Sequence, residues 1–290
     1  MRAQVLKPSE IVVVVDHSPD VLAQASRHWP DVAVVPNNNP RGLSGARNAG
    51  VAVAGGDVVA FMDDDAIADP DWTAKMASAY ERESVIGVGG AIEPLWSAAR
   101  PKWFPDEFDW VVGCTYRGLP EDPSPVRNLI GANMSFRREV FERVGDFRSG
   151  IGRFGPLPFG CEETEFCIRA GREWPEGTIL YDPRVRVRHR VGASRARWRY
   201  FLARCYAEGR SKALIAALVG RSDALATERT YATRVLPYGI GRGLSDAIFQ
   251  LDPNGLSRAG AIILGLGVTT AGFARGLAAR RGNGRPEGSR

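Results

Sequence analysis

The chain has 290 residues, of which 44% are hydrophobic and seven are Trp, so it can bury a core and is not expected to be disordered. Its four Cys show neither a CxxC pair nor zinc spacing, which excludes a zinc finger and indicates reduced thiols in a cytosolic protein. The formal net charge of +5 hides an asymmetry, because residues 184–290 hold 20 Lys and Arg against 6 Asp and Glu. The C-terminal part therefore meets an anionic surface or substrate, or simply has a well-solvated basic face.

Predicted strands and helices alternate in the first part of the chain. The apolar, β-branched runs at 10–15 and 32–35 predict strands on either side of a helix at 21–29. An Ala-rich helix is expected at 44–54, followed by a strand at 57–62. This alternation predicts an α/β layered domain with a largely parallel sheet.

The next segment continues the pattern around a long aromatic loop. The loop at 94–125 is rich in Pro and Trp, and long loops of this kind are usually lids or binding walls. Its aromatic side chains either fill a satellite core or stack on sugar rings, and both readings stay open. The other expected elements are helices at 70–82, 138–144 and 162–170, and strands at 85–92, 128–136, 179–181 and 185–187.

The character of the chain changes near residue 198. A basic helix is expected at 200–219, and the longest uncharged stretch, 259–274, has 16 residues. Because about 20 residues are needed to span a bilayer, this stretch predicts an interfacial or core helix between Arg258 and Arg275. We expect two regions: a domain over 1–198 and a basic, mainly helical, membrane-associating region over 199–290.

Three adjacent carboxylates, Asp63, Asp64 and Asp65, follow the apolar strand at 57–62. The carboxyl ends of strands in open α/β sheets are where ligands bind. Adjacent carboxylates repel each other, and a hard divalent cation offsets that cost. The alternative is a solvated acidic turn in which Asp69 caps the next helix. The triplet alone leaves both interpretations open.

Several motifs in order resemble the family 2 glycosyltransferases, which have the GT-A fold. The resemblance covers roughly residues 10–200, and it implies inverting transfer of a sugar from a nucleotide-diphosphate donor to an acceptor hydroxyl or lipid phosphate. Cell-envelope glycan or glycolipid synthesis is the expected setting. The matching segments are residues 10–16, 45–50 with 57–65, 131–136, 144–147, 160–169 and 185–189.

The resemblance assigns roles in donor binding. Asp16 falls at the nucleoside base, Arg47 at the nucleoside, and Asp63 and Asp64 at the ribose side. Each has an ordinary alternative: Asp16 could cap the next helix, and Arg47 could form a surface ion pair.

It also implies a metal site for Mn²⁺ or Mg²⁺. Asp65 matches the last acid of the family's metal motif, and His189 corresponds to a histidine that approaches the metal or the diphosphate in some members. A hydrogen-bonded core histidine is the alternative for His189. A divalent cation at this place would stabilise the departing diphosphate as a Lewis acid.

The catalytic base is expected in the acidic segment at 161–165. The family commonly has Glu-Asp here, and Glu163 occupies the position of the base with one extra methylene, with Glu162 as the fallback. Acids that complement the dipole of a helix start are the alternative. Trp103, Trp110 and Asn133 are the candidates on the acceptor side.

Other expectations concern the start of the chain, its location and competing functions. Family members begin with an additional strand and helix, so we expect the natural start to lie upstream of Met1. The chain is expected to be cytoplasmic and peripheral at the inner face of the cell membrane, with a glycan or lipid-linked acceptor. The alternative is a catalytically impaired nucleotide-sugar- or membrane-binding protein of the same fold. Nucleic-acid binding is not expected, because no reading motif accompanies the basic charge.

Overall fold

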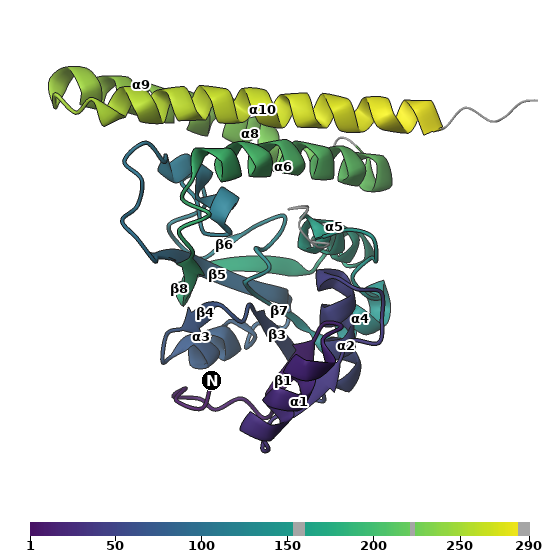
Figure 1. Cartoon of the computed structure of the whole chain (residues 1–290). Helices are drawn as coiled ribbons and strands as arrows, with labels where there is room; N and C mark the ends of the chain where they lie inside the picture. The colour runs from purple at the N-terminus through teal and green to yellow at the C-terminus, as the bar shows by residue number, and fades with distance from the viewer. Residues whose placement is uncertain (153–159, 221–223, 284–290) are drawn as a thin grey trace, which may run out of the picture.

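A six-stranded sheet lies at the centre of the computed structural model, which describes residues 1–152, 160–220 and 224–283 (Figure 1). The strand order is β3-β7-β5-β8-β4, and β6 pairs with the far side of β8. The longest ladder joins β5 and β8 in parallel, whereas the β3/β7, β5/β7, β4/β8 and β6/β8 pairs are antiparallel. The predicted α/β class is confirmed, with a sheet that is not wholly parallel. The strands are β3 (Val58–Met62), β4 (Ala66–Ala68), β5 (Val85–Trp96), β6 (Ser124–Pro125), β7 (Asn133–Arg137) and β8 (Thr178–Val191).

The two strands that the sequence predicts at 179–181 and 185–187 form one strand, β8. Pro183 interrupts the apolar pattern, but the β5/β8 register shifts between Gly90 and Ile92, opposite this part of β8. An irregularity of this kind accommodates a residue that cannot donate to the ladder. The continuous strand therefore runs on to His189 and Val191.

The N-terminal strands form a second, two-stranded parallel sheet. It consists of β1 (Val12–Val15) and β2 (Ala33–Pro36), with α1 (Pro19–His28) between them in sequence and α2 (Leu43–Val53) after them. Gly45 in the first turn of α2 is required by space, because a Cβ there would lie 2.0 Å from the carbonyl oxygen of Pro40. This contact holds the loop before α2 tightly against the helix.

Three more helices and one short 3₁₀ helix pack against the central sheet. They are α3 (Trp72–Ala79), α4 (Arg138–Val144), α5 (Glu162–Glu173) and η1 (Asp106–Val112). The aromatic loop predicted at 94–125 contains η1, and its Phe104 and Phe108 are buried against Phe201. These two aromatics therefore join the main core.

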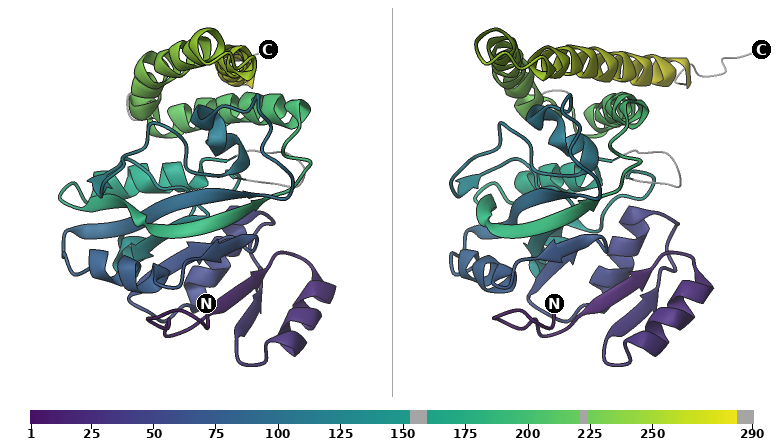
Figure 2. Two further views of the ribbon diagram at one scale, coloured as in Figure 1. Left: turned by 90° about the vertical axis from the view of Figure 1, so that its left-hand side faces the viewer. Right: turned by 60° about the vertical axis from the view of Figure 1, so that its left-hand side comes forward.

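The C-terminal helices cover the end of the molecule opposite the N-terminus (Figures 1 and 2). They are α6 (Trp198–Val219), α8 (Ala226–Thr230), η2 (Tyr231–Val235), α9 (Leu236–Phe249) and α10 (Asn254–Asn283). We call α9 and α10 together, residues 236–283, the roof. Among the described residues, α10 is the one helix whose length and composition would suit a membrane span, over Asn254–Arg280.

Small residues let α10 lie directly on α6. A Cβ at Gly209 would lie 2.0 Å from the carbonyl oxygen of Thr269, and one at Gly272 would lie 2.2 Å from that of Tyr206. Gly209 and Gly272 are therefore two points of close approach between the helices. The outcome is a helix pair whose backbones are in direct contact.

Candidate active site

Two acids of the triplet, Asp63 and Asp65, form a cluster with His189 at the end of β3. Residues Ala66 and His189 are paired in the β4/β8 ladder, which brings Nε2 of His189 within 2.9 Å of Oδ1 of Asp65. Ligand atoms of Asp63, Asp65 and His189 all lie within 4.8 Å of one another, whereas Asp64 is exposed and stands outside the cluster. The structure thus groups Asp63 with the candidate metal ligands rather than with Asp64, its predicted neighbour on the ribose side.

Arg195 adds a positive charge to this cluster, which the sequence did not indicate. Its Nη2 lies 3.7 Å from Oδ2 of Asp65, and its Nη1 is buried without a hydrogen-bond partner among the described residues. Partial burial opposes ionisation of Asp65, but the hydrogen bond to His189 and the charges of His189 and Arg195 lower its pKa overall. The carboxylate is therefore kept ionised, as a metal ligand must be.

Arg47 connects the acidic cluster to α5. Its Nη1 donates to Oε1 of Glu162 at 2.6 Å, and its Nη2 lies 3.9 Å from Asp63. Both members of the Arg47–Glu162 pair are buried, so Arg47 is not the surface residue that its sequence alternative describes. Gly131 leaves the room it needs, since a Cβ there would lie 2.4 Å from Nη2 of Arg47.

Glu163 stands in the first turn of α5 and lines the cavity beside this pair. Burial and the neighbouring carboxylate of Glu162 raise the pKa of Glu163 to about 8. Cys161, just before the helix, has a φ of 79°, a left-handed conformation that is rare outside Gly and clusters at functional sites. The first two acids of this turn therefore differ: Glu162 is tied to Arg47, and Glu163 is poised to exchange a proton near neutral pH.

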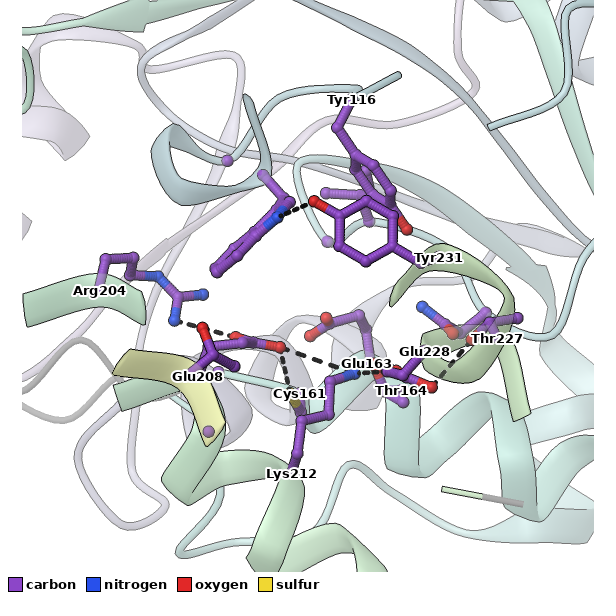
Figure 3. Close-up of a pocket in the computed structure, with 18 of the residues that line it drawn as sticks. Tyr116, Cys161, Glu163, Thr164, Arg204, Glu208, Lys212, Thr227, Glu228 and Tyr231 are labelled. Carbon is purple, nitrogen blue, oxygen red and sulfur yellow. Dashed lines mark hydrogen bonds and ion pairs between the residues drawn. The ribbon is translucent and has the colours of Figure 1, made fainter. Parts of the chain in front are cut away.

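A cavity of about 370 Å³ is lined both by members of the acidic cluster and by the first turn of α5. Asp63, His189 and Glu163 are among its lining residues, as are residues of η1, α6, α8, η2 and α10. Figure 3 shows Tyr116 and Tyr231 on one side of this space, with Glu163 across from them. The indole of Trp110 also lines it and donates to the hydroxyl of Tyr231.

Two of the predicted acceptor-side residues lie elsewhere. Trp103 packs edge-on against Trp198, with ring centroids 4.4 Å apart. Asn133 is fully buried, and its amide binds the indole of Trp72 and the carbonyl oxygens of Ala91 and Val185. Neither is among the described residues that line the cavity, and their contact with an acceptor stays a prediction.

Asp16 organises the loop that leads into α2. Its carboxylate accepts hydrogen bonds from Nδ2 of Asn37 at 2.7 Å and from the backbone N–H of Gly42 at 3.0 Å. It does not cap α1, whose N-cap is Ser18. Asp16 is therefore held at the carboxyl end of β1, and its contact with a nucleoside stays a prediction.

Comparisons with known proteins place the chain in a family. The family model described as glycosyl transferase family 2 matches residues 1–145. The glucosyl-dolichyl phosphate glucuronosyltransferase of Haloferax volcanii is 36% identical over 214 residues, which cover 72% of this chain and 68% of that protein. The succinoglycan biosynthesis protein ExoM of Rhizobium meliloti is 25% identical over 58% of this chain and 51% of its own.

A solved structure shows the same fold. The mannosyltransferase PcManGT of Pyrobaculum calidifontis, in complex with GDP-Man and Mn²⁺, has a TM-score of 0.54 and 17% identity, covering 93% of this chain and 80% of that one. The predicted GT-A fold is confirmed.

Proposed function

The chain belongs to glycosyl transferase family 2, and on this premise we propose that it is an inverting, divalent-metal-dependent enzyme whose acceptor is a lipid-linked sugar. It is a glycosyltransferase that uses nucleotide-sugar donors. The observation that carries the proposal is a single cavity lined by Glu163 and by two members of the acidic cluster, Asp63 and His189.

The donor set of the acidic cluster suits a divalent cation. Asp65 and Asp63 offer hard oxygen ligands and His189 offers a nitrogen, a mixture that favours Mn²⁺ over Mg²⁺, whose protein sites use oxygen. When bound, the cation supplies Lewis-acid stabilisation of the leaving diphosphate. Arg195, with one buried nitrogen unpartnered among the described residues, is placed to contact the same anionic group.

The residues of this chain then have distinct tasks. Glu163 accepts the proton of the attacking acceptor hydroxyl, and its raised pKa makes it a stronger base than an ordinary carboxylate once deprotonated. Arg47 holds Glu162 and Asp63 in place, so Glu162 is a positioning residue rather than a second base. One base opposite the leaving group is the arrangement that direct, inverting displacement requires.

The acceptor is proposed from the relative in Haloferax volcanii, whose name specifies a sugar carried on dolichyl phosphate. A lipid-linked acceptor needs an enzyme that works at a membrane, and the roof has the surface for it. We divide the chain accordingly into a catalytic domain over 1–198 and a membrane-associating helical region over 199–290.

The roof differs from a helix pair of a soluble protein, whose helices normally turn charged side chains outward and apolar ones inward. Several of its charged side chains are partly buried in ion pairs: Arg242 pairs with Glu107 at 3.0 Å, and Arg258 pairs with Asp246 at 2.8 Å and with Asp252 at 3.0 Å. At the same time the roof exposes large apolar side chains, namely Tyr238, Leu244, Ile248, Phe249, Leu251, Leu256, Ile263 and Leu264.

We assign this apolar surface to the inner face of an anionic bilayer. Basic Arg275 and Arg280 are exposed on α10 and complement anionic head groups. The glycine contacts between α10 and α6 keep α10 on the protein, so the roof lies on the bilayer surface rather than crossing it. Peripheral attachment at the cytoplasmic face follows.

Turnover of the donor tests the catalytic proposal. The full chain is incubated with a panel of UDP- and GDP-sugars, and release of the nucleoside diphosphate is measured with Mn²⁺, with Mg²⁺ and with EDTA. Release that requires the metal and is lost in Glu163→Gln is expected. Donor binding without any metal-dependent turnover would contradict it and would favour the non-catalytic alternative.

Vesicle flotation tests the membrane surface. The wild type is expected to float with phosphatidylglycerol vesicles, and the double variant Ile248→Asp/Phe249→Asp is expected to stay in the soluble fraction. Val21→Asp places one such charge at an exposed apolar position of α1, at the opposite end of the molecule, and should float like the wild type. Equal flotation of all three proteins would show that the apolar surface of the roof is not what binds the membrane.

A further inference from the structure

We propose that Tyr231 is the platform on which the sugar ring of the acceptor stacks, opposite Glu163, and that the hydroxyl of Tyr116 donates a hydrogen bond to a hydroxyl of that ring. The inference rests on the proposed function and names what the site recognises in the acceptor, which is a hexose ring rather than the lipid that carries it. Tyr231 lies beyond the segments that carry the family resemblance, and Tyr116 lies between two of them.

The ring of Tyr231 is anchored through its hydroxyl. This hydroxyl donates to the carbonyl oxygen of Glu107 at 2.5 Å and accepts a hydrogen bond from Nε1 of Trp110 at 3.1 Å. Both partners belong to η1, so the tyrosine is held from the other side of the cavity mouth by a separate segment. A ring fixed in this way loses little conformational freedom when a ligand packs on it.

The ring of Tyr231 is not sealed into the core. Tyr231 and Tyr116 are both partly exposed, whereas the neighbouring Phe108 is 1% exposed. Tyr116 packs edge-on against Tyr231, with ring centroids 5.4 Å apart. Trp110 is less open, because Phe108 lies 5.4 Å from its ring and the guanidinium of Arg204 lies 5.9 Å from it. We therefore assign the stacking surface to Tyr231.

The backbone at Tyr231 is also unusual. Residues Tyr231–Val235 form η2, which is the one π-helix in the part of the chain that the structure describes. Turns of this kind are rare and are frequently found at functional sites. Tyr231 and Ala232, the first two residues of the turn, both line the cavity.

The hydroxyl of Tyr116 is available to a ligand. It forms no hydrogen bond with any described residue, although Tyr116 lines the cavity. Burial raises the pKa of this phenol, and the charges that act most on it are those of Lys212 and Glu228. The hydroxyl thus keeps its proton for donation and lies nearer to α6 and α8 than to the acidic cluster.

The two walls of the cavity match the two sides of a sugar. A pyranose ring has a face of C–H groups, which suits an aromatic ring, and a rim of hydroxyls, which suits polar groups. Figure 3 shows the two tyrosines on one side, with Glu163 and Lys212 across from them. An alkyl chain would bury these polar groups without replacing their hydrogen bonds to water, which costs free energy.

The base identifies the stacked ring as that of the acceptor. Glu163 takes the proton of the attacking hydroxyl, and in a direct displacement this hydroxyl approaches from the side opposite the leaving diphosphate. The ring that lies between Glu163 and Tyr231 therefore belongs to the attacking molecule.

A purely structural role of Tyr231 is the competing explanation. Its two hydrogen bonds join η2 to η1 and would do so equally well if the ring were covered by other side chains. This explanation accounts for the anchoring, but it leaves the partly exposed ring and the unpartnered hydroxyl of Tyr116 without a purpose.

Saturation-transfer NMR with the full chain tests the stacking directly. The probes are hexyl β-glucoside, tetraethylene glycol hexyl ether, which has the chain without the sugar, and uridine. In the wild type we expect the strongest transfer to the axial C–H groups on one face of the glucose ring. Strongest transfer to the hexyl chain, equal transfer to the glycol ether, or displacement of the glucoside by uridine would overturn the proposal.

Substitutions at Tyr231 separate the ring from its anchor. Tyr231→Leu removes the ring and should raise the KM for hexyl glucoside about tenfold, while the KM for the donor stays that of the wild type. Tyr231→Phe keeps the ring without its two hydrogen bonds and should fall between them. Trp29→Leu removes an exposed aromatic ring next to α1 and is the matched control, with no change expected. A rise in the KM for the donor instead would mean that the acceptor does not stack here.

Tyr116→Phe tests the hydrogen bond without removing a ring. Binding of hexyl glucoside should weaken by roughly three- to tenfold, the usual effect of one lost hydrogen bond. In the series of monodeoxy hexyl glucosides, one member should bind the wild type and Tyr116→Phe equally, because it lacks the hydroxyl that Tyr116 contacts. The same loss with every deoxy sugar would contradict this contact.

These measurements also separate the inference from the function on which it rests. If transfer proceeds and Tyr231→Leu keeps the wild-type KM for the acceptor, the platform is wrong while the transferase activity stands. If no donor turns over, the proposed function fails, and NMR still reports whether the glucose ring contacts the cavity. The comparison of probes uses the wild type, so it remains decisive where a variant does not fold.

Discussion

Nε2 of His189 lies 2.9 Å from Oδ1 of Asp65, and this contact unites two distant parts of the chain at one edge of the sheet. The register of β4 against β8 produces it, because Ala66 faces His189 across the ladder. The acids after β3 and the end of β8 therefore depend on one strand pairing for their geometry.

Removing either ligand should abolish the response to metal. In Asp65→Asn and in His189→Gln, we expect Mn²⁺ to lose its effect on the melting temperature. Transfer should fall by about 100-fold or more, because the lost Lewis acid stabilises the transition state by several kcal/mol. Asp64→Asn is the matched control, since Asp64 stands outside the cluster, and it should keep the Mn²⁺-induced shift. A normal shift in Asp65→Asn would exclude this site.

The reaction should speed up as the pH rises towards 8. The pKa of Glu163 is raised to about 8, and a general base works only when deprotonated, so the rate should fall roughly tenfold for each pH unit below that value. A profile of kcat/KM against pH measures the ionisation in the free enzyme. Glu163→Gln should lose at least about 100-fold in kcat and all of this pH dependence. A profile that stays flat between pH 6 and 8 would argue for another base.

Glu163 should also reduce stability at alkaline pH. Its pKa is higher in the folded chain than its usual value of 4.5, so the folded state binds the proton more tightly. The resulting stabilisation is complete below the unfolded pKa, near 4.5, and is lost as the pH rises through about 8. Chemical denaturation at pH 6 and pH 9 should therefore show a larger drop for the wild type than for Glu163→Gln. The same drop in both proteins would mean that a group other than Glu163 causes the loss of stability.

Removing only one partner of the buried Arg47–Glu162 pair should lower the free energy of unfolding. Arg47→Met leaves the carboxylate of Glu162 buried without its partner, and we expect a loss of about 3–5 kcal/mol in the free energy of unfolding. In the double variant Arg47→Met/Glu162→Gln no charge is stranded, so part of the loss should return. Additive effects of the two substitutions in denaturant unfolding would show that the pair is not coupled.

Two glycines of α10 should respond in opposite ways to the same substitution. In Gly272→Ala the new Cβ would meet the carbonyl oxygen of Tyr206 at 2.2 Å, so α10 must move away from α6 at a cost of about 1–3 kcal/mol. Gly267 has no atom within 4 Å of the corresponding position, and Gly267→Ala should stabilise the chain by about 0.5–1 kcal/mol. Thermal unfolding of both variants measures the difference, and equal shifts would place α10 away from α6.

The sequence was sufficient to predict those elements in which functional residues directly adjoin a clear local pattern of apolar and polar residues. The strand before Asp63 and the helix that begins at Glu162 follow from apolar runs and from their polar ends, and both are present. The helix at 200–219 was likewise expected, and α6 spans Trp198–Val219. Each of these features depends on residues close together in the chain.

The remaining features depend on contacts between distant segments. Arg47 looks like a surface residue in its helix, and only the packing of α2 against α5 buries it with Glu162. Trp103 looks like a sugar platform, but Trp198 of α6 covers it. Asn133, the first residue of β7, is used for internal hydrogen bonds. Long-range pairing of this kind leaves no periodic trace in one sequence.

Helix α6 contacts α10 on one side and lines the cavity on another. Its Gly209 touches α10, while Arg204 and Lys212 on the same helix reach the cavity beside Glu163. The distance from the outer surface of the roof to the reacting carboxylate is therefore set by the thickness of two packed helices, whose axes lie about 8–10 Å apart when small residues meet. Altering the size of one residue at the α6–α10 contact would change how far the chemistry stands from that surface, without replacing any group that touches a substrate.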